Sequence, residues 1–217
     1  QLRFGIEVEM TGITREKASQ VAASYLGGES LYLGTYYKTY AATDSQGRMW
    51  KFTYDGSIQA EKKENGERVP ADKPYKTEMV SPICTYEDIP TIQELVRQLR
   101  HKGAFSNSST GIHIHVDASS FDARTLRNLV NLFYSKEDLL FAALKVDPAR
   151  WAYCSPTDER FIQELNRKRP QTMKAFQKIW YGGEDGSDLH YHQSRYHALN
   201  LHSVFSHGTV EFRLFNS

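Results

Sequence analysis

The chain has 217 residues, which is enough for one domain whose core buries about 70% of the surface exposed by the unfolded chain. Its 27 lysines and arginines nearly balance 26 aspartates and glutamates, so bulk charge does not indicate a nucleic-acid or membrane partner. The longest apolar run is far shorter than the roughly 20 residues of a membrane helix, and the N-terminus shows no signal-peptide pattern. The cysteines, Cys84 and Cys154, lack CxxC spacing and are interpreted as ordinary buried thiols, so we expect a cytoplasmic protein.

The order of apolar and polar residues predicts a mixture of strands and helices. A strand is predicted at residues 2–10, and Thr14 opens a short helix that ends near Gly27 and Gly28. Residues 31–55 predict a hairpin that turns at 44–47, and 61–73 are expected to form a polar loop. The later elements are predicted as a strand at 75–81, a helix at 87–102, a strand at 111–117, helices at about 122–144, 158–167 and 171–180, and a hairpin of 196–204 with 209–215.

This order of elements predicts a single α+β domain over residues 1–217. We expect a mostly antiparallel sheet of about six to seven strands with helices packed on one face.

Three of the predicted strands carry ionisable residues two positions apart. They are Glu7 and Glu9 in RFGIEVEM, His113, His115 and Asp117 in GIHIHVD, and Glu211 and Arg213 in TVEFRLF. Residues i and i+2 of a strand point to the same face, with Cα atoms about 6–7 Å apart. If the rows share one face of a sheet, they line a charged trough suited to divalent cations. Because unpaired buried charge is costly, such rows favour an enzyme.

Of three further features, the first two each have two interpretations. Glu78 is either a solvated strand residue or a further metal ligand. Arg213 is either the ion-pair partner of Glu211 or a clamp for phosphate, a role that suits its planar guanidinium. The Asp55-Gly56-Ser57 sequence is first of all typical of a turn.

Taken together, the polar motifs occur in a known order along the whole chain. They are Glu-x-Glu, Asp-Gly-Ser, Glu-x-Val-Ser-Pro, Gly-x-His-x-His, Arg-Tyr followed by Leu-Asn, and Glu-Phe-Arg. With these motifs the chain resembles the amidoligases, compact carboxylate–amine ligases that share the fold of glutamine synthetase. The resemblance implies a glutamine synthetase-like catalytic domain that uses ATP to form an amide through an acyl phosphate.

The resemblance also implies cofactors and partners. Two or three Mg²⁺ or Mn²⁺ ions would neutralise charge on ATP and on the substrate. The substrates would be a small-molecule or peptide carboxylate, such as a glutamate-like acid, and an amine. Neither nucleic acid nor membrane is implied, and the oligomeric state stays open. Because no GxxxxGK[ST] motif is present, phosphate binding would rely on metals, arginines and strands.

Individual residue roles follow from the same resemblance. Glu7, His113 and Glu211 would hold the ion nearer the phosphates, and Glu9 and Glu78 the ion nearer the acyl centre. His115 would contact phosphate or the substrate carboxylate, Arg213 and Arg195 would stabilise the phosphoryl group in transit, Asp55 would orient or deprotonate the amine, and Asn200 would position substrate. A third carboxylate for the second ion is missing, and Asp117, Glu61 and Glu64 are the alternatives.

Two other classes of protein remain open from the sequence. A metal-dependent hydrolase or cupin-like oxygenase would use His113 and His115 on one ion. The stretch 118–121 lacks the glutamate expected of a cupin, and 31–81 shows no helix for an amidohydrolase barrel. A non-catalytic binding module would instead use its polar rows as salt bridges. Turnover of ATP separates the ligase from both.

Overall fold

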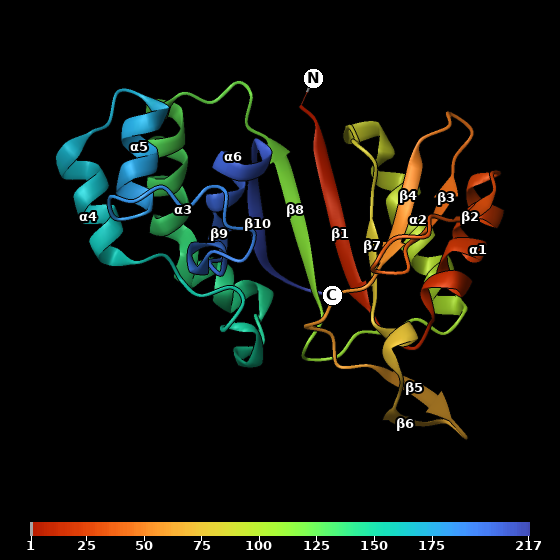
Figure 1. Cartoon of the computed structure of the whole chain (residues 1–217). Helices are drawn as coiled ribbons and strands as arrows, with labels where there is room; N and C mark the ends of the chain where they lie inside the picture. The colour runs from red at the N-terminus through yellow and green to blue at the C-terminus, as the bar shows by residue number, and fades with distance from the viewer. Residues whose placement is uncertain (1) are drawn as a thin grey trace. The chain divides into compact units, whose positions relative to one another are not determined.

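The computed structural model describes residues 2–217, which fold into two compact units (Figure 1). The first unit extends to Ile112 and includes Ser217, and the second comprises His113–Asn216. Strand β8 (Gly111–Asp117) begins in the first unit and continues into the second. Within residues 2–217, no helix has the length and apolar character needed to cross a membrane.

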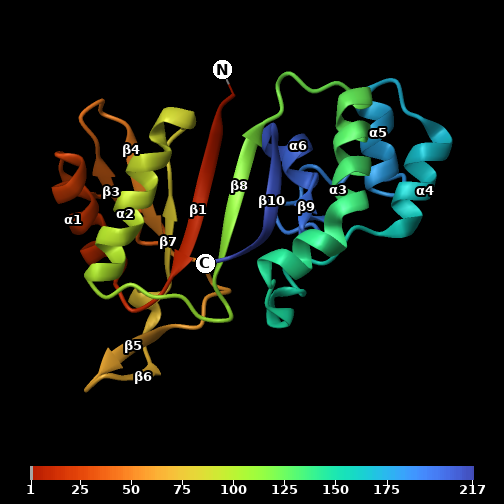
Figure 2. The same ribbon diagram turned by 180° about the vertical axis from the view of Figure 1, so that it is seen from behind.

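The first unit is built on five antiparallel strands. Their order is β2 (Ser30–Tyr32), β3 (Tyr40–Thr43), β4 (Met49–Thr53), β7 (Thr77–Val80) and β1 (Phe4–Met10). Helices α1 (Arg15–Leu26) and α2 (Ile89–His101) cover one face of these strands, as Figure 2 shows. The arrangement confirms helices on one face of an antiparallel sheet. Short 3-10 turns, Lys73–Tyr75 and Tyr86–Asp88, precede β7 and α2.

The alternation of side chains in β1 assigns one face to the core and the other to polar groups. Val8 and Met10 pack with the helices, together with Met79 of β7. Glu7 and Glu9 therefore point to the opposite face. The register places Glu9 directly opposite Glu78. The polar face of this sheet is consequently built from residues that are far apart in the sequence.

The ends of α1 agree with the sequence prediction. The Thr14 side chain accepts a hydrogen bond from the Lys17 backbone N–H, which satisfies one of the unpaired donors of the first turn. Gly27 ends the helix in the left-handed conformation, with φ of 72°. Both cysteines are free and buried, as predicted, and burial raises the pKa of each thiol.

The predicted hairpin between β3 and β4 is present, and Asp44 holds its turn. The Asp44 carboxylate accepts hydrogen bonds from the backbone N–H groups of Gln46 and Arg48, each at 2.9 Å. It also accepts from Arg48 Nε at 2.8 Å and from the indole of the fully buried Trp50 at 3.3 Å. Burial alone would raise the pKa of Asp44, but these bonds outweigh it and lower the pKa.

We expect Asp44→Ala to lower the free energy of unfolding at pH 7 by about 2–3 kcal/mol, because it leaves a buried indole N–H and turn amides without an acceptor. Since the folded-state pKa of Asp44 is depressed, its contribution is present above the unfolded pKa and is lost as the pH falls through the folded one. Urea unfolding at pH 7 and at pH 3 checks both points. Equal midpoints for Asp44→Ala and wild type at pH 7 would contradict the assignment, and Asp44→Asn is the conservative control.

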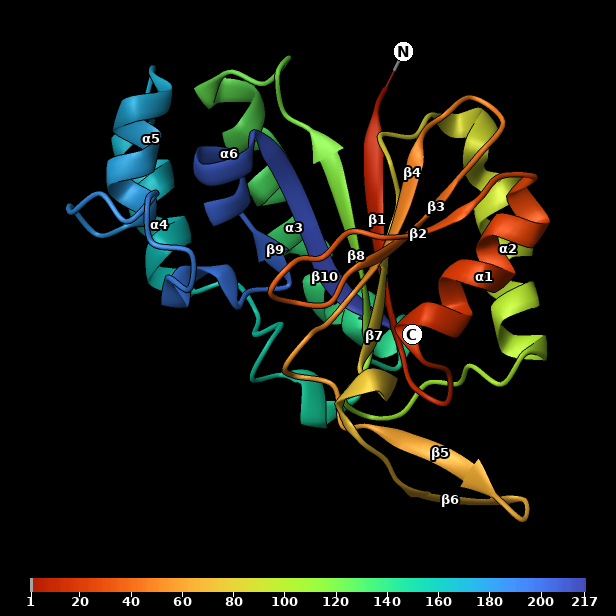
Figure 3. The same ribbon diagram turned by 45° about the vertical axis from the view of Figure 1, so that its right-hand side comes forward.

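A second hairpin occupies most of the region predicted as a polar loop, so that prediction was wrong. Strands β5 (Glu61–Glu64) and β6 (Glu67–Pro70) pair as a separate two-stranded sheet, which Figure 3 shows extending from the first unit. Asn65 and Gly66 form the turn with φ of 51° and 87°, as a two-residue hairpin loop requires. These strands are polar on both faces, so they lack the alternation of apolar and polar residues that predicts a strand. The Asn65-Gly66 pair, which is typical of a hairpin turn, was the signal that the sequence offered.

The second unit combines three strands with four helices. Its strands follow the order β8, β10 (Thr209–Asn216) and β9 (Leu199–Asn200). The helices are α3 (Ala123–Leu144), α4 (Glu159–Lys168), α5 (Met173–Trp180) and α6 (His202–His207). Val210 and Leu214 of β10 share a core with Val130 of α3. Glu211 and Arg213 alternate with these apolar residues and so lie on the other face of β10.

Two predictions about strands need correction. The first strand of the C-terminal hairpin is only Leu199–Asn200, because the following residues form α6, which ends at Gly208 with φ of 74°. In addition, β2 is a strand of its own rather than part of the hairpin at 31–55. Among residues 2–217, the strands outside the β5–β6 hairpin number eight, not six to seven.

Candidate functional site

Three carboxylates gather on the polar face of the first unit. Glu9 comes from β1, Glu78 from the opposing position of β7, and Asp55 from the turn after β4. One oxygen from each lies within 4.8 Å of the others. Glu9 and Glu78 are only 4% and 9% exposed, and Asp55 is half-buried. Hard oxygen donors at this spacing are the ligands that Mg²⁺ and Mn²⁺ prefer, so these residues fit a divalent ion.

Hydrogen bonds position two of these carboxylates. Glu9 Oε2 accepts the backbone N–H of Gly111 at 2.6 Å. Asp55 Oδ1 accepts both the backbone N–H of Ser57, at 2.6 Å, and its hydroxyl, at 2.5 Å. The Asp-Gly-Ser sequence is therefore a turn, and the turn also holds a carboxylate next to Glu9 and Glu78.

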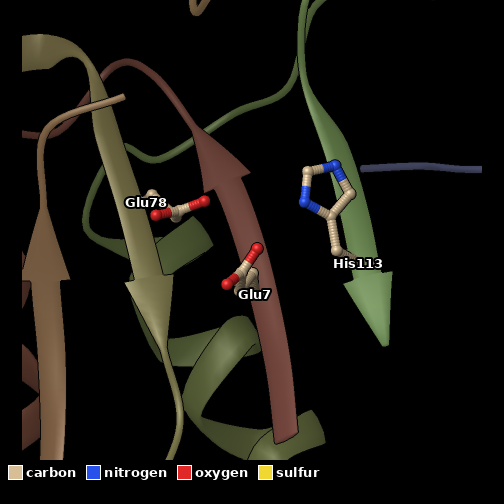
Figure 4. A group of neighbouring side chains, drawn as sticks. All are labelled: Glu7, Glu78 and His113. Atoms are coloured by element: carbon tan, nitrogen blue, oxygen red, sulfur yellow. The ribbon is translucent and has the colours of Figure 1, made fainter. Parts of the chain in front are cut away.

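Glu7 extends the same face of β1. It lies two residues before Glu9 and opposite Val80, which places it diagonally across from Glu78. Figure 4 shows the Glu7 and Glu78 side chains on their neighbouring strands, β1 and β7. The first unit thus presents four of the predicted residues on one face. Asp55 is the third carboxylate of this group, whereas Glu61 bonds Asn107 and Glu64 pairs with Lys62.

In the second unit, several of the predicted site residues lie around Glu211. Arg213 Nη1 contacts Glu211 Oε1 at 2.5 Å, and Asn200 Nδ2 donates to Oε2 at 2.6 Å. His113 Nδ1 and His115 Nε2 each lie 3.7 Å from Oε1. Glu211, Arg213, His113 and Asn200 are all buried. A carboxylate beside two imidazoles offers oxygen and nitrogen donors to a cation, and Arg213 offers a positive charge to an anion.

Neighbouring groups orient the imidazole and the guanidinium of this set. His115 Nδ1 lies 3.0 Å from the Thr209 hydroxyl, which in turn contacts Ser203 at 2.8 Å. Arg213 Nε donates to the backbone carbonyl of Tyr153 at 3.2 Å. The ion-pair interpretation of Arg213 is therefore present in the structure. The second interpretation, a phosphate clamp, stays a prediction.

Arg195 and Asp117 have other surroundings. Arg195 Nη1 donates to the His190 carbonyl at 2.9 Å, and its guanidinium carbon lies 5.6 Å from the ring centres of Tyr191 and Tyr196. Asp117 accepts the backbone N–H of Ser119 at the end of β8. Among the residues that the structure describes, Arg195 contacts His190, Tyr191 and Tyr196 and no contact with Glu211 is seen, so its predicted role at the phosphoryl group stays a prediction.

Sequence reasoning missed His202, which is buried beside this set. Its Nδ1 lies 2.6 Å from the Tyr181 hydroxyl, and its ring stacks on that of His192. Burial first, and then the neighbouring His192, lower the pKa of His202, while burial raises the pKa of Tyr181 to about 12. Near pH 7 the pair is therefore a neutral phenol and a neutral imidazole.

Buried polar atoms without a hydrogen-bond partner in the described part of the second unit include Asn200 Oδ1 and His202 Nε2. Such atoms are rare in folded proteins and usually bind a water or a ligand. They mark the surroundings of Glu211 as a polar site rather than a packed core. A histidine two residues after Leu-Asn was the only signal for His202 in the sequence.

Comparison with known proteins supplies one finding. The model of a family described as "putative amidoligase enzyme" matches residues 1–217. A search among curated proteins found no match.

Proposed function

Because the chain belongs to the amidoligase family, we propose that it joins a carboxylate to an amine at the expense of ATP. The observation that best supports the chemistry is the meeting of Glu9, Asp55 and Glu78, whose oxygens lie within 4.8 Å of one another. Three carboxylates so close repel each other unless a cation lies among them. A divalent cation is what a reaction on the phosphates of ATP also needs.

The proposal assigns metal ligands in each unit. In the first unit, Glu9 and Glu78 serve one ion. Glu7 of the first unit and His113 and Glu211 of the second unit supply ligands for the remaining ions. When bound, Mg²⁺ or Mn²⁺ neutralises charge on the phosphates and the reacting carboxylate. The carboxylates and imidazole of this chain provide hard donors with one nitrogen ligand, a set that tolerates Mn²⁺ as well as Mg²⁺.

The reaction is proposed in two steps. A substrate carboxylate oxygen attacks the γ-phosphorus of ATP, the bond to the bridging β–γ oxygen breaks, and ADP leaves. The amine nitrogen then attacks the acyl carbon, and inorganic phosphate leaves as the amide forms. Asp55 accepts the proton that the amine loses. Arg213, held by Glu211 and the Tyr153 carbonyl, stabilises charge on the phosphoryl group, with His115 and Asn200 binding the nucleotide or the substrate.

A binding module with structural salt bridges is the main alternative. It accounts for the pair of Glu211 with Arg213. It does not require Glu9 and Glu78 to lie directly opposite each other, and like charges at opposing strand positions repel. This difference favours the metal-dependent ligase.

Thermal unfolding tests the proposal without knowledge of the substrates. Wild-type protein is heated with a non-hydrolysable ATP analogue, with Mg²⁺ or Mn²⁺, with both and with neither. Ligand at about 100 times its dissociation constant adds roughly 2.7 kcal/mol, which raises the midpoint by roughly 5–10 °C at this chain length. We expect metal to raise the midpoint and the nucleotide analogue to raise it further only when metal is present. A shift with metal that the nucleotide does not increase would favour the hydrolase or oxygenase, and no shift with any addition would contradict the proposed site.

A further inference from the structure

A cavity of about 400 Å³ lies in the first unit, on the face of the sheet opposite Glu7 and Glu9. Val8 and Met10 of β1 form one wall, Val96 and Leu99 of α2 form another, and Phe105 adds an aromatic ring. Its volume falls within the range of roughly 300–1,000 Å³ that is usual for sites of small organic ligands. The wall is mostly apolar, so an occupant must bring an apolar body.

Two arginines give this cavity its polar character. Arg68 of β6 and Arg100 in the last turn of α2 both line it and are both exposed. The Arg68 guanidinium lies 4.5 Å from the ring centre of Phe105, and Lys63 Nζ lies 5.8 Å from the same centre. The described residues that line the cavity include no aspartate or glutamate. The charge around it is therefore positive and calls for an anion.

We propose that this cavity binds a small carboxylate that carries an apolar or aromatic body. The apolar part would fill the space between β1 and α2, and the carboxylate would reach the arginines, whose planar fork matches two carboxylate oxygens. The site is separate from the acid that the proposed ligase would activate, because successive residues of β1 point to opposite faces. It does not depend on the proposed function.

The size of the cavity argues for a small molecule over a protein segment. Standard protein interfaces bury about 800 Å² on each partner, far more surface than a cavity of this volume presents. One compact ligand of about a dozen non-hydrogen atoms suits it better. Such a ligand should bind with a dissociation constant of roughly 0.1–1 mM, given the usual free energy per atom.

Isothermal titration with 4-phenylbutyrate and with 4-phenylbutan-1-ol tests the proposal, because these probes share the apolar body and differ in the charged group. We expect the carboxylate to bind at least about fivefold more tightly than the alcohol, and Arg100→Gln to remove most of that difference. Arg97→Gln is the matched control, since Arg97 lies on the same helix but pairs with Glu94 and does not line the cavity. Val96→Phe fills the cavity and should abolish binding of both probes.

Several results would overturn the inference. Equal binding of acid and alcohol would remove the role of the arginines, and binding that survives Val96→Phe would place the ligand elsewhere. No saturable binding at 10 times the upper expected dissociation constant, about 10 mM, would exclude the ligand class. A concentration-dependent dimer that Val96→Phe dissociates would show that a second copy of the chain fills the cavity. Urea unfolding confirms that each variant folds, and the exposed Arg100→Gln keeps the test valid if Val96→Phe does not.

Discussion

Replacing Glu211 with glutamine is expected to remove the stabilisation by nucleotide and metal and to reduce ADP formation by at least about 100-fold. The glutamine keeps an oxygen for Asn200 but loses the charge that a metal ion and Arg213 both require. Thermal unfolding with the ATP analogue and Mg²⁺ measures the first effect. ADP release with mixtures of acids and amines measures the second.

The same substitution should also destabilise the protein. Arg213 is buried, and removing one partner of a buried ion pair costs about 3–5 kcal/mol. We expect a smaller loss, about 2–3 kcal/mol, because the Tyr153 carbonyl still accepts from Arg213 Nε. The double variant Glu211→Gln with Arg213→Gln should recover part of the stability and none of the activity. Recovery of both would mean that Glu211 only compensates Arg213.

Glu137→Gln is the matched control for a buried glutamate in the same unit. Glu137 accepts the backbone N–H and the hydroxyl of Thr157, and burial raises the pKa of its carboxyl group. A raised folded-state pKa means that the folded protein binds the proton more tightly than the unfolded chain. Stability from this group therefore falls as the pH rises from the unfolded pKa through the folded one. Glu137 takes no part in the proposed site, so the control should keep nucleotide binding. Because glutamine carries no charge, the control should also avoid the loss of stability that ionisation of the buried Glu137 causes in wild type at pH 8.

The sequence predicted the elements that carry a regular pattern and missed those that do not. Strands β1 and β10 combine alternating apolar residues with polar motifs, and both appear where the alternation places them. The β5–β6 hairpin has charged residues on both faces, because it forms a separate two-stranded sheet with little apolar surface to cover. The spacing of apolar residues reflects which face of an element is buried, so it cannot predict a strand that buries little apolar surface.

The candidate residues show the same limit in a different form. Glu9 and Glu78 could each be chosen from motifs, but their direct opposition depends on the register between β1 and β7. Asp55 reaches them because β4 ends in a turn at the matching height, which no local pattern encodes. His202 depends on Tyr181 and His192, which precede it by 21 and 10 positions. The sequence shows which residues share one face of a strand. Contacts between residues of different strands and loops become visible only in the folded structure.

The opposition of Glu9 and Glu78 leads to a second prediction, in which one substitution has opposite effects with and without metal. Without divalent ions, Glu78→Gln should raise the free energy of unfolding by about 0.5–1 kcal/mol, because it removes a like charge at an opposing strand position. With Mg²⁺ or Mn²⁺ at about 100 times the wild-type dissociation constant, wild type should gain roughly 2.7 kcal/mol and the variant almost nothing. The order of stability should therefore reverse when metal is added.

Urea unfolding in chelator and in saturating Mn²⁺ measures both parts of this prediction. Glu67→Gln is the control, because Glu67 is an exposed glutamate on β6 and lies opposite Glu64 rather than near Glu9. The control should respond to metal as wild type does. A Glu78→Gln protein that is less stable in both conditions, with wild type indifferent to metal, would make Glu78 a structural residue and favour the binding module. A reversal confined to Glu78→Gln would mean that the protein keeps two repelling carboxylates together in order to bind a cation.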